Sequence, residues 1–217
     1  MLTLLPLSQY KKQALRQEKI DLSGYPKELK LRDDTQVTLR PMKKGDGEKL
    51  LEFFNNLEPR AKLFLKDDVS DPKVIQYWED NLDFSRIIPI LAFQDDKIIG
   101  NATLHRSSRG WARHVGEMRI VTAHEYRKKG LGYLLTREIF FLAQKLRVDM
   151  VMAQVMSTQE DAIRVFEKLG FKKEAVLKDA VMDMRNKKHD LLILTQDISV
   201  LWQQIENLIH DMEDHGG

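Results

Sequence analysis

The sequence predicts a mixed α/β fold built on a mixed sheet. Segments with strand-like alternation and segments with helical spacing follow one another in an unusual order. That order is neither a regular strand–helix alternation nor a purely antiparallel pattern. A loop rich in glycine and lysine also separates one predicted strand from a long amphipathic helix. The 217 residues, of which 42% are hydrophobic, suit a single domain with its own core.

Composition excludes several classes of protein. The chain has no cysteine, which rules out disulfides, thiolate metal sites and cysteine nucleophiles. Its 35 basic and 33 acidic residues give a net charge of +2, which is not the basic excess typical of nucleic-acid binding. No apolar run approaches the ~20 residues of a membrane helix. We therefore expect a cytoplasmic protein with no metal, no nucleic-acid partner and no membrane partner.

Residues 1–35 differ from the rest of the chain in composition and patterning, and we expect them to form an N-terminal extension. Residues 8–20 have the composition of a short charged helix, and Gly24-Tyr25-Pro26 ends it. Residues 28–32 and 36–40 alternate polar and apolar side chains around a polar turn, which predicts a hairpin.

Two helices and three strands are expected next. Leucines and phenylalanines from Leu50 to Leu57 recur at helical spacing, and Asp71-Pro72 has the pattern of a second helix start. Asp95-Asp96 is expected to form a tight turn between the first two strands. The three strand-like runs are residues 86–93, 97–105 and 114–122.

The second half of the chain shows the strongest helical pattern. Apolar residues from Leu131 to Leu146 recur at helical spacing, and the nearly continuous apolar run 148–156 is typical of a strand covered on both faces. Gly170 is expected to end a further helix. The remaining elements are a helix at 161–169, strands at 171–183 and 189–195, and an amphipathic helix at 198–212. The main domain is expected at 36–196. The segment 197–217 either covers the sheet or mediates self-association into a homodimer.

The stretch from Ile120 to Leu135 has the features of an anion site. A strand leads into a loop with two glycines and three cations, and that loop opens a helix. Glycines let the backbone approach a ligand, and the first helical amides have no partner within the helix. A phosphate or pyrophosphate fits such a site, although a solvated basic turn has the same composition. A Walker motif needs lysine directly after the last glycine, where this chain has Tyr133. The dinucleotide fingerprint G-x-G-x-x-G needs a third glycine where this chain has Leu135.

Three ordered segments resemble the GNAT superfamily of N-acetyltransferases. Arg127, Gly130 and Gly132 match the family pattern Q/R-x-x-G-x-G/A. Residues 162–171 (AIRVFEKLGF) resemble the segment A-x-x-x-Y-E-K-x-G-F, and residues 37–46 resemble the opening strand and helix start. The resemblance covers residues 36–195. It implies a central, mostly antiparallel sheet that acetyl-CoA splays apart, with helices on both faces.

The resemblance also implies which residues bind acetyl-CoA. The loop amides would hold the pyrophosphate, and the end of the preceding strand would pair with the pantetheine arm. Two positions depart from the family: Gln159 stands where Asn is frequent, and Phe166 replaces the tyrosine that usually acts as general acid. The expected cofactor-binding residues are Ile120, Val121, Thr122, Arg127, Lys128, Lys129, Gly130, Leu131, Gly132, Tyr133, Gln159 and Phe166.

Glu117 is the candidate catalytic base. An amine acceptor is mostly protonated at neutral pH and must lose a proton before it attacks a thioester. Bacterial protein-lysine acetyltransferases, which this chain resembles most, carry a glutamate at this strand position, and Tyr25 to Leu29 resembles their lead-in. The alternative is that Glu117 simply pairs with Arg119 on the same strand face. His105, His114 and His124 are expected to be ordinary surface or loop residues.

We therefore expect an enzyme that transfers acetyl from acetyl-CoA to a primary amine by direct attack in a ternary complex. Protein lysine is the first acceptor considered, and a polyamine, an aminoglycoside or another small amine is the alternative. Phe166 also motivates a different class, a non-catalytic module that senses acyl-CoA.

Overall fold

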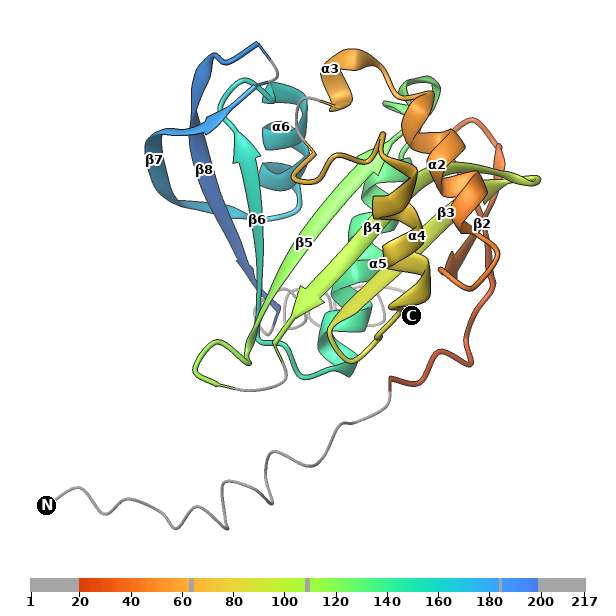
Figure 1. Ribbon diagram of the computed structural model, residues 1–217. Helices are drawn as coiled ribbons and strands as arrows, with labels where there is room; N and C mark the ends of the chain where they lie inside the picture. Colours follow the sequence, from red (N-terminus) through yellow and green to blue (C-terminus); the bar gives the residue numbers. More distant parts are fainter. Residues whose placement is uncertain (1–19, 63–64, 108–109, 184, 199–217) are drawn as a thin grey trace, which may run out of the picture.

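The computed structural model describes residues 20–62, 65–107, 110–183 and 185–198 (Figure 1). The helices expected at 8–20 and 198–212 lie outside these residues, apart from one border residue each. In chain order the elements are β1 (Lys27–Lys30), β2 (Gln36–Pro41), α2 (Gly47–Asn55), α3 (Pro59–Lys62), α4 (Pro72–Asp80), β3 (Ile87–Gln94), β4 (Lys97–Arg106), β5 (Val115–Thr122), the 3₁₀ turn η1 (His124–Tyr126), α5 (Leu131–Lys145), β6 (Met150–Met156), α6 (Glu160–Lys168), β7 (Lys172–Met182) and β8 (Lys188–Asp197).

One eight-stranded sheet runs in the order β1-β2-β3-β4-β5-β6-β8-β7. Every neighbouring pair is antiparallel except β5 and β6, which are parallel and are connected through α5. This confirms the predicted mostly antiparallel mixed sheet. The predicted hairpin forms β1 and β2, so part of the expected extension belongs to the same sheet as the rest.

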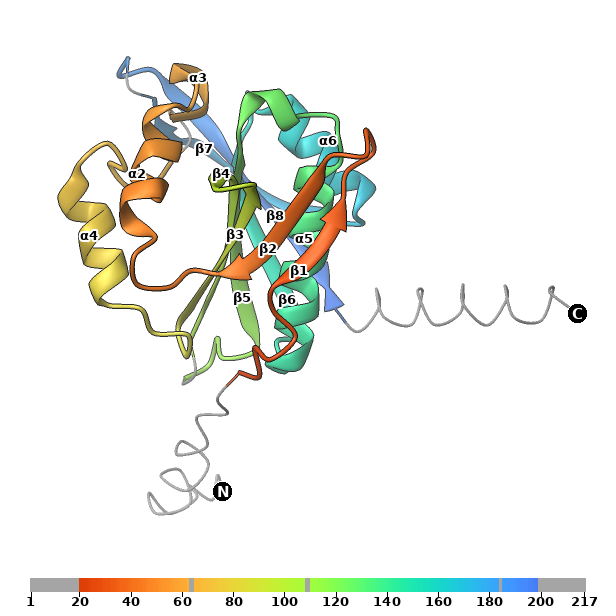
Figure 2. The ribbon, with the colours of Figure 1, turned by 90° about the vertical axis from the view of Figure 1, so that its right-hand side faces the viewer.

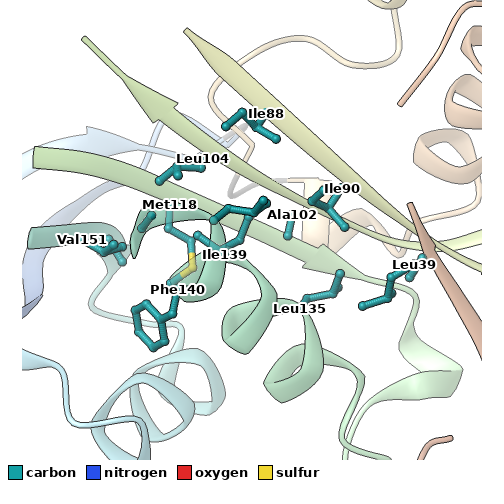
Figure 3. Close-up of a cluster of buried hydrophobic side chains, with 14 of the residues drawn as sticks. Leu39, Ile88, Ile90, Ala102, Leu104, Met118, Leu135, Ile139, Phe140 and Val151 are labelled. Atoms are coloured by element: carbon teal, nitrogen blue, oxygen red, sulfur yellow. The ribbon is translucent and has the colours of Figure 1, made fainter. Parts of the chain in front are cut away.

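Helices cover both faces of the sheet, as predicted. Figure 2 shows α2 and α4 on one face and α5 and α6 on the other. On the α5 face, Leu135 and Ile139 are fully buried against residues of β3 and β4 such as Ile90 and Leu104 (Figure 3). Truncating a buried isoleucine of this kind to alanine typically costs about 2–5 kcal/mol.

A second core lies between the sheet and the pair α2 and α4. The start of α2 is held by Arg40 on β2, whose two Nη atoms donate to the buried Asp46 carboxylate at 2.7 Å each. Glu79 of α4 accepts the Gly47 N–H at 2.9 Å, which ties the two helices together. The second helix begins where the sequence predicts, because the Asp71 side chain caps it by accepting the Lys73 N–H.

Two short elements were not predicted. The helix α3 has four residues and η1 has three, and neither is long enough to show a helical period. Both precede parts of the functional region: α3 leads to Lys66, and η1 leads to the glycine loop.

The expectation that residues 148–156 are covered on both faces is wrong. Val151, Ala153 and Val155 are buried on the α5 side, whereas Met150 and Met152 are only half-buried on the other. The α2–α4 core contains residues of β3 and β4 but none of β6, so this face of β6 remains partly open.

Candidate active site

The parallel strands β5 and β6 separate partway along their length. Their pairing begins at Val115↔Met150 and ends at Met118↔Ala153, after which β5 continues to Thr122 without β6. Strand β6 meanwhile stays paired with β8 along its whole length. Figure 1 shows the two strands diverging. This is the split in the sheet that the family resemblance implies.

The hydrogen-bond pattern of β5 decides which backbone groups face the split. The Ala123 N–H donates to the Ile99 carbonyl at 2.9 Å, and alternate residues of an antiparallel pair bond in the same way. Val121 therefore bonds to β4, and its side chain packs against the α2–α4 core. The amides of Ile120 and Thr122 point toward β6, where no strand meets them, and could pair with an extended ligand.

The glycine loop lies directly after the open end of the split. Lys128 and Gly130 have φ angles of +63° and +96°, a left-handed conformation that glycine adopts without strain. Helix α5 then begins at Leu131, and no side chain caps it. The first helical amides, up to Tyr133, therefore have no partner within the helix and favour an anion. A Cβ added to Gly132 would meet no atom within 4 Å, so a ligand can approach the backbone there.

The loop is less positive than its sequence indicates. Arg127 pairs with Glu58 at 3.1 Å, and Lys129 pairs with Asp33 at 2.9 Å. Within the part of the chain that the structure describes, Lys128 has no ion-pair partner. Two of the three cations in the loop are therefore already paired with carboxylates.

The β1–β2 turn supports the loop from outside. The Arg32 N–H donates to the Lys129 carbonyl at 3.0 Å, and the Arg32 side chain lies against Gly130. No feature of the sequence indicates this contact, because the two segments are almost one hundred residues apart.

Helix α6 approaches the loop at its first turn, where the charges of Lys128 and Arg127 act on Asp161. The Gln159 side-chain oxygen accepts the Met156 N–H at 2.9 Å and so closes the end of β6. Phe166 packs edge-on against Phe171, with ring centroids 4.8 Å apart. The aromatic ring at the family's tyrosine position is therefore half-buried, packs against the core and supplies no polar group.

Glu117 lies on β5 beside the closed end of the split, one residue before the last pair with β6. Its Oε1 accepts from Lys66 Nζ at 2.6 Å and from Arg119 Nε at 3.0 Å. Burial raises the pKa of this carboxyl, but the two cationic donors outweigh burial and hold the pKa below its usual range. The Arg119 pair expected as the alternative is therefore present, and Lys66 is an additional partner.

Two further polar groups share the strand face of Glu117. His105 lies directly opposite it on β4, and its Nε2 is 2.9 Å from Thr103 Oγ1. Burial, aided by the charge of Arg119, lowers the pKa of His105 to about 4, so the ring is neutral at pH 7. The expectation of an ordinary surface residue is wrong for His105, whereas His114 and His124 are exposed.

Asn101 is the second of these groups. It lies on the same face of β4, and its buried Oδ1 has no hydrogen-bond partner among the described residues. Detecting either residue from the sequence would require the strand register.

No three His, Asp or Glu side chains in the described ranges are arranged to hold a metal ion. Nor does any helix in those ranges have the length and apolarity to cross a bilayer.

A split sheet with an uncapped helix start at its open end is the arrangement that the family resemblance implies, and comparison with known proteins agrees. The sequence profile of the Acetyltransferase (GNAT) family matches residues 51–171, more than half of the chain. The chain therefore belongs to the GNAT acetyltransferase family.

Individual relatives are more distant. The L-amino acid N-acetyltransferase AaaT of Escherichia coli K12 is 28% identical over 99 residues, which span 45% of this chain and 61% of that protein. The GNAT domain of S. lividans PAT superposes with a TM-score of 0.69 at 16% identity, covering 82% of this chain and 99% of that one. The structure of yncA from Salmonella typhimurium, which contains acetyl-CoA, superposes with a TM-score of 0.62 at 19% identity, covering 75% of this chain and 94% of that one. The two structures show the shared fold.

Proposed function

We propose that this chain transfers the acetyl group of acetyl-CoA to a primary amine, with a protein lysine as the preferred acceptor. The observation that carries the proposal is the position of Glu117 at the closed end of the split. The anion-binding start of α5 lies at the opposite, open end. A ligand with a phosphate at one end and a reactive acyl group at the other would span this distance.

Each part of the site has a role in this reaction. The first amides of α5 would hold the pyrophosphate, and the amides of Ile120 and Thr122 would pair with the pantetheine arm. Acetyl-CoA supplies the activated thioester. Glu117, held ionised by its cationic neighbours, accepts a proton from the amine, whose ordinary pKa of about 10.4 keeps it charged at neutral pH. Because Phe166 has no proton to donate, the departing thiolate takes its proton from the amine or from water.

The acceptor is inferred from the surroundings of Glu117. A lysine ammonium, that of Lys66, already lies against the carboxylate, which supports an acceptor with a long cationic side chain. A free L-amino acid is the second candidate. The E. coli relative is an L-amino acid N-acetyltransferase, which supports this candidate, and Arg119 beside Glu117 offers a cation for a carboxylate.

The experiment is to measure CoA release from acetyl-CoA with a panel of amines. The panel contains a lysine peptide, the same peptide with arginine in place of lysine, the twenty free amino acids and a polyamine. We expect release with the lysine peptide and none with its arginine control. Faster release with a free amino acid would replace the first acceptor by the second. Acetyl-CoA binding without release for any amine would support the non-catalytic sensor instead.

A further inference from the structure

Lys66 occupies the place on Glu117 that an acceptor amine must reach. Its Nζ lies 2.6 Å from Glu117 Oε1 on β5 and 2.8 Å from Gln154 Oε1 on β6. The ammonium therefore bridges the two strands beside Met118↔Ala153, the last pair before they separate. A primary amine of this chain is already held at the closed end of the split.

Neighbouring residues hold Lys66 in this position. Asp67 contacts Arg119 Nη1 at 3.5 Å, so two consecutive residues of the segment contact the strand face around Glu117. Val69 is buried in the α2–α4 core and anchors the same segment from the other side. The placement of Lys66 thus depends on three separate contacts.

The ion pair is accessible rather than sealed. The Lys66 side chain is 37% exposed and that of Glu117 20%, so water reaches the pair from one side. The amine can therefore leave its ionic contact from the solvent side and react.

We propose that Lys66 is a site of self-acetylation by this chain, an inference that rests on the proposed function. The Lys66 ammonium gives one proton to the Glu117 carboxylate, and the freed amine attacks the thioester carbonyl of acetyl-CoA. The new C–N amide bond forms as the C–S bond breaks. The second proton of the amine goes to the departing thiolate, and coenzyme A leaves as the thiol. Glu117 then releases the proton it accepted to water. The acetylated side chain is neutral, so Glu117 keeps Arg119 as its cationic partner and is open to an external amine.

The test is the acetylation of the full chain by acetyl-CoA, followed by peptide mass mapping over time. We expect an acetyl group on Lys66 that forms with a first-order rate constant independent of protein concentration, as a reaction within one chain requires. Lys66→Arg, which keeps the charge but has no primary amine, removes the adduct. Lys62→Arg is the matched control, because Lys62 is four residues away and its Nζ donates to the Asn55 carbonyl instead. It leaves acetylation of Lys66 unchanged. Glu117→Gln slows the step by about 10²–10⁴-fold, the usual contribution of a general base.

A second measurement needs no acetyl-CoA. Labelling with an amine-reactive acetyl ester reports how firmly Glu117 and Gln154 hold the ammonium. We expect slower labelling of Lys66 than of Lys62 in the native chain, and faster labelling of Lys66 in Glu117→Gln.

Two results would overturn self-acetylation while leaving the proposed function intact. These are an unmodified Lys66 in a preparation that acetylates external amines, and a first-order rate constant that rises with protein concentration, which indicates transfer between chains. An equal rate constant in Glu117→Gln would overturn the proton transfer from Lys66 to Glu117 and, with it, the base role of Glu117 in the proposed function. Failure to bind acetyl-CoA at all would overturn both proposals.

Discussion

Glu117 shows how the surroundings of one residue set its chemistry. Two cationic donors on the same carboxylate oxygen hold its pKa below the usual range despite burial. A carboxyl whose folded pKa is lowered stays ionised as pH falls to its ordinary pKa of about 4.3. The rise of kcat/KM with pH should therefore follow deprotonation of the amine acceptor, not of Glu117.

Glu117→Gln should lower kcat by about 10²–10⁴-fold at neutral pH, because an amide cannot accept the proton of the amine. The dissociation constant for acetyl-CoA should not change, since the anion-binding loop lies at the other end of the split. Steady-state kinetics and calorimetric binding separate the two quantities. Glu174→Gln on the exposed strand β7 is the control. Equal turnover in wild type and Glu117→Gln would remove Glu117 from the base role.

His105 makes a prediction about stability. Its pKa falls from an ordinary 6.5 to about 4 in the folded chain, so between these values the unfolded chain binds a proton that the folded chain does not. The contribution of neutral, buried His105 to the free energy of unfolding is therefore fully present above about pH 6.5. It declines as pH falls toward about pH 4. The full shift corresponds to about 3 kcal/mol, at about 1.4 kcal/mol for each pH unit.

Urea unfolding at about pH 5 and about pH 7.5 measures this dependence. The free energy of unfolding should change less between the two conditions in His105→Gln than in the wild type. Identical changes would show that burial of His105 does not contribute.

At the scale of elements, the loop between β5 and α5 and the first turn of α5 each contain one glycine. The two glycines are needed for different reasons. Gly130 has a φ of +96° and ends the loop, so a β-branched side chain there is strained. Gly132 lies within the first turn of α5 against open space. One glycine serves the backbone of the free protein, and the other leaves room for a ligand.

Gly132→Val should fold at least as well as the wild type, because glycine is a poor helix former by about 0.5–1 kcal/mol. It should nevertheless bind acetyl-CoA at least about tenfold more weakly, which is about 1.4 kcal/mol. Gly130→Val should show the opposite order, with stability reduced by about 1–2 kcal/mol. Thermal unfolding and binding measured on both variants test this contrast. Unchanged affinity in Gly132→Val would exclude the loop as the pyrophosphate site.

At the scale of the whole molecule, the sheet consists of two halves with a narrow junction. Strands β1 to β5 and strands β6 to β8 are paired through only the four residue pairs of β5 and β6. A ligand that bonds along both edges of the split would therefore join the halves where the sheet itself does not.

Acetyl-CoA at 100 times its dissociation constant should stabilise the chain by about 2.7 kcal/mol. That is a shift of about 5–10 °C in Tm, at about 2–4 °C for each kcal/mol. Hydrogen exchange of the Ile120 and Thr122 amides should slow when acetyl-CoA is bound. NADH and ATP are the control ligands for the shift in Tm. An equal shift with all three ligands would indicate general anion binding.

The chain's local signals predicted much of this structure. The Asp71 cap, the Asp95-Asp96 turn and the glycine loop could be located because each depends on residues close together in sequence. The partners of Glu117 could not, because Lys66 is 51 residues away and His105 reaches it only through the register of β4 and β5. Ion pairs such as Arg127–Glu58 likewise depend on tertiary approach.

The contact between the β1–β2 turn and the glycine loop has a thermodynamic consequence. Two consecutive residues of the turn contact Lys129. The Arg32 backbone N–H donates to the Lys129 carbonyl, and the Asp33 carboxylate pairs with the Lys129 ammonium. If acetyl-CoA draws Lys129 toward its phosphates, the Asp33 contact weakens, and the hairpin is held less tightly. Linkage makes this effect reciprocal: a protein that binds the hairpin and pulls Asp33 away must change the affinity for acetyl-CoA by the same factor. Under that condition, the binding of acetyl-CoA at the loop and the binding of a protein at the hairpin are energetically coupled.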